Sequence, residues 1–413
     1  MAQKFIKKGY EIVDFEEEAN ICIINTCTVT NMSDKKSRQM LRRVKDKFPK
    51  TIVVAVGCYA QVAEEELKKI DEIDLVLGNN EKSNIVEYIE EYISKKNKIF
   101  KISDVMYQNK YKEIDITTYT EKTRAVIKVQ DGCDKFCSYC IIPYARGRVR
   151  SRNSKNIIEE IQKVAENGIK EVVITGIHVA SYGKDFKEEY RLIDLLEEIN
   201  KIEGINRIRL GSIEPTLITE TFLERAKQLE KLCHHFHLSL QSGCNNTLKR
   251  MNRKYTTEEF KMIVDLLRKA YNDVILTTDI IVGFPGETDE EFETTYKFLS
   301  NMKFYKMHVF KFSPRKGTKA EKMEYQIDGN IKEERSNRLI ELSIKNQNEY
   351  NKSYIGKEIE VLYEEKNGEI YQGHTQNYIL VKNIKSVEND LENQIIKTRI
   401  ISSKDEYIEG EVI

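Results

Sequence analysis

Short apolar runs alternate with amphipathic stretches along the first hundred residues. The apolar runs have the length and the Val and Ile content of buried strands, and they lie at 20–25, 51–56 and 75–77. The amphipathic stretches have helical spacing and lie at 2–9, 33–48, 63–70 and 85–95. Strands that alternate with helices predict an open parallel α/β sheet over residues 1–100. The polar stretch 97–121 has weak periodicity and predicts a linker.

A second, longer alternation begins near Arg124. Its apolar runs predict strands at 125–130, 171–175, 207–212, 236–241, 275–282 and 306–312. The stretches between them predict helices at 154–167, 191–202, 220–232, 257–271 and 289–302. A full TIM barrel has eight strand–helix units, so six strands predict a partial (β/α)6 TIM-like barrel over residues 121–350.

The pattern changes again after the charged amphipathic stretch 330–351. Four short strand-like runs joined by turns predict a small β-barrel over 351–413, and they lie at 358–363, 378–381, 394–401 and 407–412. The longest uncharged run, Ala19–Ser33, has 15 residues, whereas a membrane span needs about 20 apolar residues. We also see no apolar signal segment, so we expect a cytoplasmic protein that does not cross a membrane.

The chain has 67 Lys and Arg residues and 67 Asp and Glu residues, so its net charge is zero. This balance excludes a protein held to nucleic acid by bulk charge alone, but it allows local basic patches. Segment 35–50 carries eight basic residues against one Asp, whereas segment 354–413 carries seven basic against 12 acidic residues. Two further basic groups on the predicted barrel suggest a phosphate-binding rim, with ordinary solvated charges as the alternative. They are Arg146, Arg148, Arg150 and Arg152, and Lys249, Arg250, Arg253 and Lys254.

Eight cysteines in a chain without export signals are more often metal ligands or catalysts than disulfide partners. Three of them, Cys133, Cys137 and Cys140, lie in one loop directly after the first predicted barrel strand. Three thiolates can hold three irons of a [4Fe–4S] cluster and leave the fourth iron open to a substrate. Ferredoxin loops use four cysteines and structural zinc sites usually use two CxxC pairs, so neither template fits. The alternatives are an unusual zinc site or cysteines without a ligand role.

The CDKFCSYC spacing resembles that of the radical S-adenosylmethionine (SAM) superfamily. In that superfamily the open iron binds SAM, and one electron cleaves it to methionine and a 5′-deoxyadenosyl radical. Further segments, which cover nearly the whole chain in order, resemble the methylthiotransferases of this superfamily. They are INTCTVTNMSDKKSRQ, VGCYAQ, AVIKVQDGCDKFCSYCIIPYARGRVRSR, TGIHVASYG, SIEP, LSLQSGCNNTLKRMNRKYT, IIVGFPGET and FSPRKGT.

The resemblance implies a three-part plan and a set of partners. The parts are an N-terminal methylthiotransferase domain (1–100), a radical SAM barrel (121–350) and a TRAM β-barrel (351–413). The implied catalytic ligands are Cys133, Cys137 and Cys140, the cofactors are a [4Fe–4S] cluster and SAM, and the partner is a tRNA anticodon stem-loop. An electron donor such as flavodoxin or ferredoxin is also implied, and we expect a monomer. TRAM domains of the family bind RNA, but the acidity of this C-terminal segment weakens the expectation that it also does so.

A second, auxiliary [4Fe–4S] cluster with three cysteine ligands is a further implication. Cys27 and Cys58 match two of its ligands, and the third lies upstream in the family. We therefore expect the first strand and the first ligand to be missing from this chain. We favour a misassigned start codon, and a truncated protein with a labile auxiliary cluster is the alternative. Cys22 lies inside an apolar strand, where we expect a small buried hydrophobe rather than a substitute ligand.

The resemblance also implies contacts with SAM, for which purely structural roles are the alternative. The implied SAM contacts lie near the cluster or at strand ends: Tyr139, Gly176, Glu214, Gln241, Ser242 and Gly283. The tRNA contacts that we expect come instead from the two basic groups on the predicted barrel rim: Arg146, Arg148, Arg150, Lys249, Arg250 and Arg253.

INTCTVTN followed by DKKSRQ is most similar to one branch of the family. That branch converts N6-threonylcarbamoyladenosine, 3′ of the anticodon, to its 2-methylthio derivative. The nearest alternative is a sibling enzyme that acts on isopentenyladenosine in tRNA or on an aspartate of a ribosomal protein. An alternative of another class is a non-catalytic iron–sulfur protein that binds RNA.

Overall fold

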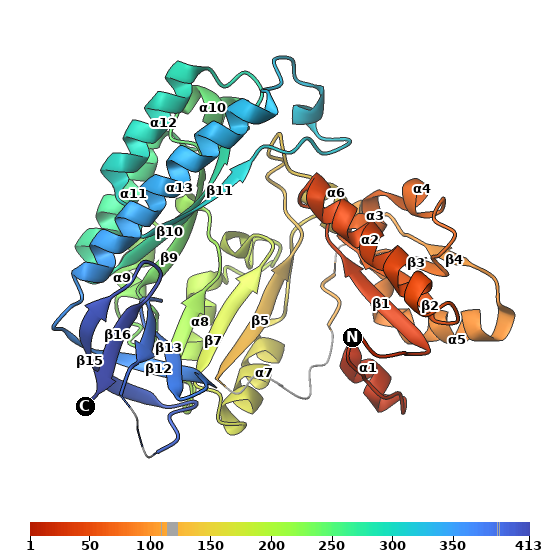
Figure 1. Ribbon diagram of the computed structural model, residues 1–413, viewed down its shortest axis with the longest axis horizontal. Coiled ribbons are helices and arrows are strands. Elements are labelled where there is room, and N and C mark those ends of the chain that lie inside the picture. The colour runs from red at the N-terminus through yellow and green to blue at the C-terminus, as the bar shows by residue number, and fades with distance from the viewer. Residues whose placement is uncertain (109, 114–122, 386, 388) are drawn as a thin grey trace. The chain divides into compact units, whose positions relative to one another are not determined.

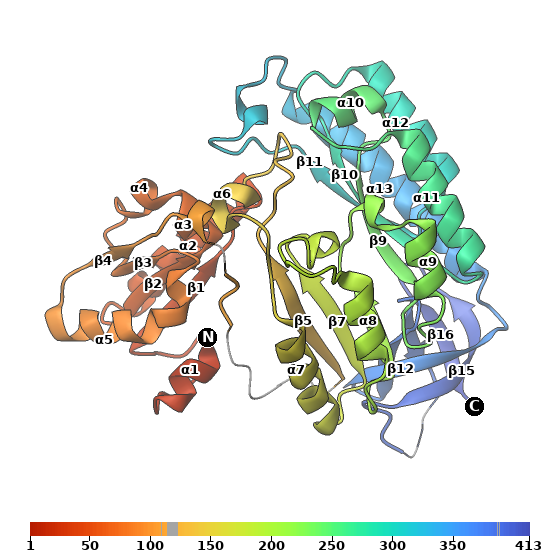
Figure 2. The same ribbon diagram turned by 180° about the vertical axis from the view of Figure 1, so that it is seen from behind.

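The computed structural model describes residues 1–108, 110–113, 123–385, 387 and 389–413 (Figures 1 and 2). The chain divides into two compact units. The first contains Met1–Thr118, Asp131–Arg150 and Ser313–Lys322, and the second contains Tyr119–Gln130, Ser151–Phe312 and Met323–Ile413. The loop with the CDKFCSYC motif therefore belongs to the same unit as the N-terminal sheet.

The first unit is built on a parallel sheet with the strand order β1-β2-β3-β4. Buried residues of β2 face two cores in alternation, because Val53 and Ala55 pack with α2 whereas Val54 and Val56 pack with α5. Helices on both faces of a parallel sheet explain why its strands are continuous apolar runs. The strands are β1 (Ile21–Thr26), β2 (Ile52–Gly57), β3 (Leu75–Leu77) and β4 (Ile99–Lys101). The helices are α1 (Ala2–Lys7), α2 (Asn31–Lys47), α3 (Cys58–Val62), α4 (Glu64–Leu67), α5 (Ile85–Lys95) and α6 (Ile142–Arg146), with 3-10 turns η1 (Glu81–Asn84), η2 (Val105–Tyr107) and η5 (Lys319–Lys322).

The predicted open sheet is confirmed, with two differences. β4 lies inside the predicted linker, because a three-residue strand with a single buried residue, Ile99, leaves no readable pattern. The helix predicted over 63–70 is shorter, because it consists of α4 alone, and the short helix α3, which was not predicted, precedes it.

The second unit contains the predicted partial barrel, and all six predicted strands are present. The parallel sheet β5-β7-β8, with the two-residue β6 beside β5, is joined to the sheet β9-β10-β11 by bridges from Ile208 to Leu232 and from Ile213 to Leu238. The strands are β5 (Arg124–Asp131), β6 (Arg150–Ser151), β7 (Glu171–Gly176), β8 (Arg207–Leu210), β9 (His235–Gln241), β10 (Ile275–Val282) and β11 (Lys306–Lys311). The helices are α7 (Ser154–Glu166), α8 (Leu192–Asn200), α9 (Glu220–Ala226), α10 (Asn245–Arg250), α11 (Thr257–Ala270), α12 (Asp289–Met302) and α13 (Gly329–Lys352), with 3-10 turns η3 (Val179–Ser181) and η4 (Pro215–Leu217).

The C-terminal segment of the second unit forms the predicted small β-barrel. It is closed, with the strand order β12-β13-β14-β16-β15. One strand, β13, is absent from the prediction because its sequence alternates weakly. It lies very close to β12, since a Cβ on its Gly373 would lie 2.0 Å from the backbone oxygen of Leu362. None of the described helices is both long and apolar enough to cross a membrane. The strands are β12 (Glu358–Asn367), β13 (Ile370–Thr375), β14 (Leu380–Asn383), β15 (Ile395–Ser403) and β16 (Ile408–Val412).

Candidate functional site

Two cysteines follow neighbouring strands of the first unit. β1 and β2 pair in parallel with Thr26 opposite Gly57, and Cys27 and Cys58 come next along the chain. Gly57 has a φ of 108°, and a Cβ there would lie 2.5 Å from the Thr26 backbone oxygen, so this approach requires glycine. Cys27 is exposed and Cys58 is half-buried. The structure thus brings both predicted auxiliary ligands to one edge of the sheet.

The loop after β5 carries the other three predicted ligands and is held at its start by backbone contacts. The Cys133 N–H donates to the Gly147 oxygen at 3.0 Å. Gly132 has a φ of 74°, and a Cβ there would lie 1.8 Å from the backbone oxygen of Arg148. Only glycine fits this position, so the close approach to Arg148 fixes the start of the loop. The three cysteines are all half-buried: Cys133, Cys137 and Cys140.

The donor chemistry of both cysteine groups is that of iron–sulfur clusters, with three thiols in the loop after β5 and two, those of Cys27 and Cys58, at the sheet edge. Thiolates are the usual ligands of [4Fe–4S] clusters, and a cluster spreads them over several irons. Among the described side chains, no three His, Cys, Asp or Glu residues converge as the ligands of a single metal ion would. Side-chain N–H groups also face one of the sulfurs, that of Cys58, as expected around a thiolate ligand. A folded loop with three thiols fits a cluster that keeps one iron open.

Arg146, at the end of α6, contacts Cys58 and also Asp131, which lies two residues before Cys133. Its Nε and Nη2 donate to the two carboxylate oxygens of Asp131 at 2.9 and 2.7 Å. Its Nη1 donates to Asn79 Oδ1 at 3.0 Å and lies 4.0 Å from Cys58 Sγ. Asn79 Nδ2 donates to Cys58 Sγ at 3.7 Å and to the Ala145 oxygen at 2.8 Å. Burial lowers the pKa of Arg146, but Asp131 outweighs burial and raises it, so the guanidinium stays charged.

The remaining cysteines are partly or fully buried. Cys22, on β1, packs against the core between the sheet and α2; it is half-buried rather than fully buried as predicted, and burial raises the pKa of its thiol. Cys233 and Cys244 are buried in the second unit, and burial raises the pKa of Cys233 to about 11. These environments suit small hydrophobes rather than thiolates.

Glu214 is a buried carboxylate just after β8 in the second unit. Its Oε2 lies 2.8 Å from His178 Nε2, and its Oε1 lies 3.8 Å from an Arg253 guanidinium nitrogen. His178 is fixed in turn, because Nδ1 bonds Ser181 Oγ at 2.6 Å and its backbone N–H donates to Gln130 Oε1 at 2.8 Å. These neighbours hold the carboxylate in one orientation.

Other predicted SAM contacts lie at the same edge of the barrel sheets. Gly176 is the last residue of β7, Gln241 is the last residue of β9, and Gly283 follows β10. Since parallel strands end at one edge, these residues share the face on which barrel enzymes place their sites. The Ser242 hydroxyl accepts from the Cys244 N–H at 3.3 Å and so supports its own turn. Tyr139 belongs to the first unit, where it is half-buried.

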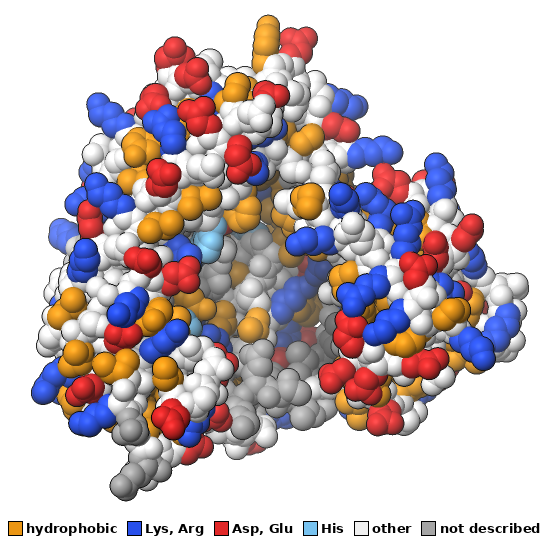
Figure 3. Space-filling model, viewed as in Figure 1, with side chains coloured by type: hydrophobic (Ala, Val, Ile, Leu, Met, Phe, Trp, Pro, Cys, Tyr) orange, Lys and Arg blue, Asp and Glu red, His pale blue; other side chains and the backbone are white. Residues whose placement is uncertain are grey.

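The six predicted tRNA contacts divide by exposure. Arg148 is exposed over the Phe136 ring, and Lys249 is exposed at the end of α10. The guanidinium groups of the other four are directed at protein groups: Arg146 at Asp131, Arg150 at the Arg146 oxygen, Arg250 at Glu291, and Arg253 at the Ser239 oxygen. Lys and Arg side chains also gather over α2 in Figure 3, where the exposed ones are Lys35, Lys36, Arg42, Arg43 and Lys47.

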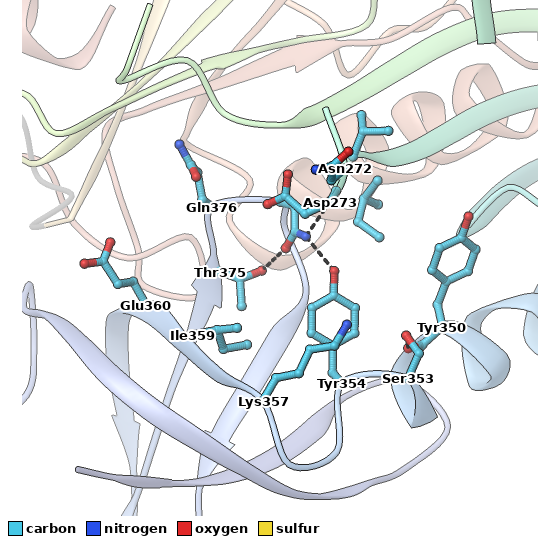
Figure 4. A pocket seen from close by; sticks show the side chains of 13 residues that line it. Asn272, Asp273, Tyr350, Ser353, Tyr354, Lys357, Ile359, Glu360, Thr375 and Gln376 are labelled. Carbon is cyan, nitrogen blue, oxygen red and sulfur yellow. Dashed lines mark hydrogen bonds between the residues drawn. The ribbon is translucent and has the colours of Figure 1, made fainter. Parts of the chain in front are cut away.

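A pocket of about 440 Å³ lies elsewhere in the second unit, between the start of β10 and the C-terminal barrel (Figure 4). Asn377 Nδ2 donates to Tyr354 Oη at 2.7 Å and to the Asp273 oxygen at 2.9 Å, and it joins the two barrels. The pocket is at the N-terminal ends of the strands, opposite the edge that carries Glu214. None of its described lining residues is a predicted SAM or tRNA contact.

Two neighbours of the site were not predicted: Asn79 and Asp131. A signal existed for Asn79, because it follows β3 at the edge that carries Cys27 and Cys58. Open α/β sheets place ligands at this edge. Asp131 lies two residues before Cys133 in the sequence, but its pairing with Arg146 could not be predicted from sequence spacing.

Comparisons with known proteins agree with this geometry. Residues 127–299 match the Radical SAM superfamily model, and residues 1–78 match the Uncharacterized protein family UPF0004 model. A solved radical SAM methyltransferase, TsrM from Kitasatospora setae, shares the fold with a TM-score of 0.52 and 16% identity, over 71% of this chain and 62% of that chain.

Curated relatives are similar over nearly the full chain. The threonylcarbamoyladenosine tRNA methylthiotransferase MtaB of Bacillus subtilis (strain 168) is 42% identical over 100% of this chain and 92% of its own length. MtaB of Aquifex aeolicus is also 42% identical, over 92% of each chain. The tRNA-2-methylthio-N(6)-dimethylallyladenosine synthase of Caldicellulosiruptor saccharolyticus is 35% identical over 98% of this chain and 87% of its own length. At this identity and coverage, the chain belongs to the tRNA methylthiotransferases of the radical SAM superfamily.

Proposed function

We propose that this enzyme converts N6-threonylcarbamoyladenosine, 3′ of the tRNA anticodon, to its 2-methylthio derivative. The observation that carries the proposal is the 42% identity, over the whole chain, to the B. subtilis enzyme named for that nucleoside. The two cysteine groups within one unit support it, because the reaction needs a site for SAM cleavage and a site for sulfur. Membership of the radical SAM superfamily implies a [4Fe–4S] cluster and SAM.

Cys133, Cys137 and Cys140 would hold the cluster that binds SAM, and Cys27 and Cys58 would contribute to an auxiliary cluster. When bound, the clusters and SAM would supply two things. One is a 5′-deoxyadenosyl radical that removes hydrogen from C2 of the adenine, and the other is the sulfur of the methylthio group. That C–H bond is unactivated, so protein acids and bases alone could not break it.

Residues at the barrel edge would orient SAM. The Glu214 carboxylate offers a charged acceptor to the cationic end of SAM, and His178 and Arg253 fix its direction. Backbone at Gly176, Gln241 and Gly283 provides the surrounding turns; Gln241 and Gly283 have φ values of 73° and 68°. Tyr139, between two cluster cysteines, would pack beside the bound groups.

The tRNA would be held through its phosphates and through a splayed anticodon loop, since proteins read RNA sequence mainly in unstacked single strands. The exposed Arg148 and Lys249 are the members of the predicted set that could pair with phosphates. We further propose that the enzyme acts in the cytoplasm as a monomer, with an electron from flavodoxin or ferredoxin.

The test is mass spectrometry of tRNA nucleosides from a deletion strain complemented with this chain or with Cys137→Ala. We expect 2-methylthio-N6-threonylcarbamoyladenosine to return only with the unchanged chain. In vitro, Cys137→Ala should also abolish reductive formation of 5′-deoxyadenosine. Retained SAM cleavage in this variant would contradict the assignment of the cluster ligands.

The second candidate substrate is N6-dimethylallyladenosine in tRNA. It is favoured by the 35% identity, at 98% coverage of this chain, to the C. saccharolyticus synthase. The same nucleoside profile separates the two, because complementation would then restore the methylthio derivative of the dimethylallyl nucleoside instead.

A further inference from the structure

We infer that Arg146 and Asn79 are positioning residues for the Cys58 sulfur, and that through Asp131 they couple the auxiliary cluster to the loop that holds the SAM cluster. This inference rests on the proposed function, because it requires an auxiliary cluster at Cys58.

The first part concerns the surroundings of Cys58. Asn79 Nδ2 donates to Cys58 Sγ at 3.7 Å, and Arg146 Nη1 lies 4.0 Å from the same sulfur. The two side chains also hold each other, because Arg146 Nη1 donates to Asn79 Oδ1 at 3.0 Å. Asn79 is fixed from behind by Gln61, whose Oε1 accepts from the Asn79 backbone N–H at 2.9 Å. The sulfur therefore faces an oriented pair of N–H donors, one of which carries a positive charge.

The second part concerns the other end of Arg146. Its Nε and Nη2 bind both oxygens of Asp131, and Asp131 Oδ1 also accepts from the Gly132 backbone N–H at 2.8 Å. Gly132 directly precedes Cys133. A single guanidinium thus touches the sulfur environment of one cysteine group and the root of the loop that carries the other.

Burial makes these contacts effective. The side chains of Arg146 and Asp131 keep only 15% and 16% of their surface exposed. At such sites a charge is less screened by water than at the surface, and a planar guanidinium that binds two oxygens at once cannot be replaced by lysine without losing contacts.

Donors and positive charge around a ligating sulfur favour the more negative, reduced state of a cluster. The arrangement therefore predicts that removing either side chain lowers the reduction potential of the auxiliary cluster. It also predicts that the two substitutions do not add, because each residue holds the other in place.

The experiment uses the full chain with Cys133, Cys137 and Cys140 all replaced by Ala, so that any reconstituted cluster belongs to the auxiliary site. Potentials are measured by redox titration followed by electron paramagnetic resonance in this parent and in parents that also carry Arg146→Gln, Arg146→Lys or Asn79→Ala. Arg43→Gln is the matched control, since it removes an exposed arginine of the same unit that pairs with Glu16.

For Arg146→Gln we expect the ratio of reduced to oxidised cluster, at a fixed potential, to fall about tenfold, which is about 59 mV for a one-electron couple. Asn79→Ala should lower the reduction potential by less than Arg146→Gln does. The potential of Arg146→Lys should lie between those of the parent and Arg146→Gln, and that of Arg43→Gln should equal that of the parent. If the Arg146→Gln variant does not assemble a cluster, the reduction potentials of Asn79→Ala and Arg146→Lys test the inference instead. A parent without any auxiliary cluster overturns this inference together with the auxiliary site. A cluster whose potential does not respond, or responds equally to Arg43→Gln, overturns the inference alone.

Discussion

Replacing Glu171 with Gln removes the carboxylate from a buried group of arginines in the second unit. Glu171 begins β7, is fully buried, and accepts from Arg124 Nε at 2.8 Å and from Arg209 Nε at 2.7 Å. Arg124 also reaches Glu364 at 2.7 Å, and Arg209 donates to the Gln376 oxygen at 3.1 Å. Glu171 therefore pairs with two arginines that join the partial barrel to the C-terminal barrel.

The size of the effect follows from the pKa of Glu171. Burial would raise this pKa, but Arg209 and Arg124 outweigh burial and lower it to about 2. Against an ordinary glutamate pKa of about 4.3, this corresponds to about 3 kcal/mol of folding stability at neutral pH. Removing one partner of a buried pair costs a similar 3–5 kcal/mol, roughly, in other proteins. Because 1 kcal/mol shifts the Tm of a unit of this size by about 2–4 °C, we expect Glu171→Gln to melt about 6–12 °C lower.

The assay is thermal unfolding followed by far-ultraviolet circular dichroism, because the chain has no Trp. The folded pKa is depressed, so the stabilisation is complete above about pH 5 and is lost as the pH falls toward 2. The difference in Tm between Glu171→Gln and the unchanged chain should therefore become smaller at acidic pH. Glu293→Gln is the control, since that side chain is 55% exposed in its pair with Arg338 and should change little. Equal melting of Glu171→Gln and the unchanged chain at pH 7 would refute the reasoning, as would a gap that persists undiminished at low pH.

Three further predictions concern the site. Cys22→Ala should leave iron and sulfide content after reconstitution unchanged, whereas Cys27→Ala should lower both, and equal losses would contradict the burial argument for Cys22. Glu214→Gln should weaken SAM binding about tenfold or more in equilibrium dialysis, because a charged acceptor contributes about 1.5–3 kcal/mol; unchanged affinity would remove Glu214 from the SAM site. Arg148→Gln and Lys249→Gln should each reduce the salt dependence of tRNA binding by about one phosphate contact, and a residue whose loss leaves that slope unchanged does not touch RNA.

Elements with strong local signals could be predicted closely from the sequence. β10 and α12 have their predicted bounds, because one is rich in β-branched residues and the other begins with a capping box between Thr288 and Glu291. β4 and β13 could not be found, because they are held by their neighbours rather than by their own pattern. The same contrast applies to cysteines: the spacing of Cys133, Cys137 and Cys140 is local, whereas the approach of Cys27 to Cys58 depends on strand pairing.

The arginines that alternate after the cluster loop show why the rest of the site could not be predicted. In an extended chain, residues two apart point to the same side, so Arg146, Arg148, Arg150 and Arg152 suggest one continuous phosphate-binding stripe. The backbone is not extended throughout, because Arg146 ends α6, Gly147 has a φ of 76°, and only Arg150 and Ser151 form a strand. The side chains therefore separate: Arg146 turns to Asp131 and Cys58, Arg148 stays exposed, and Arg152 pairs with the buried Glu160. One basic motif thus divides into a neighbour of Cys58, a candidate RNA contact and a structural ion pair, a division set by a single glycine turn and by acidic partners distant in the sequence.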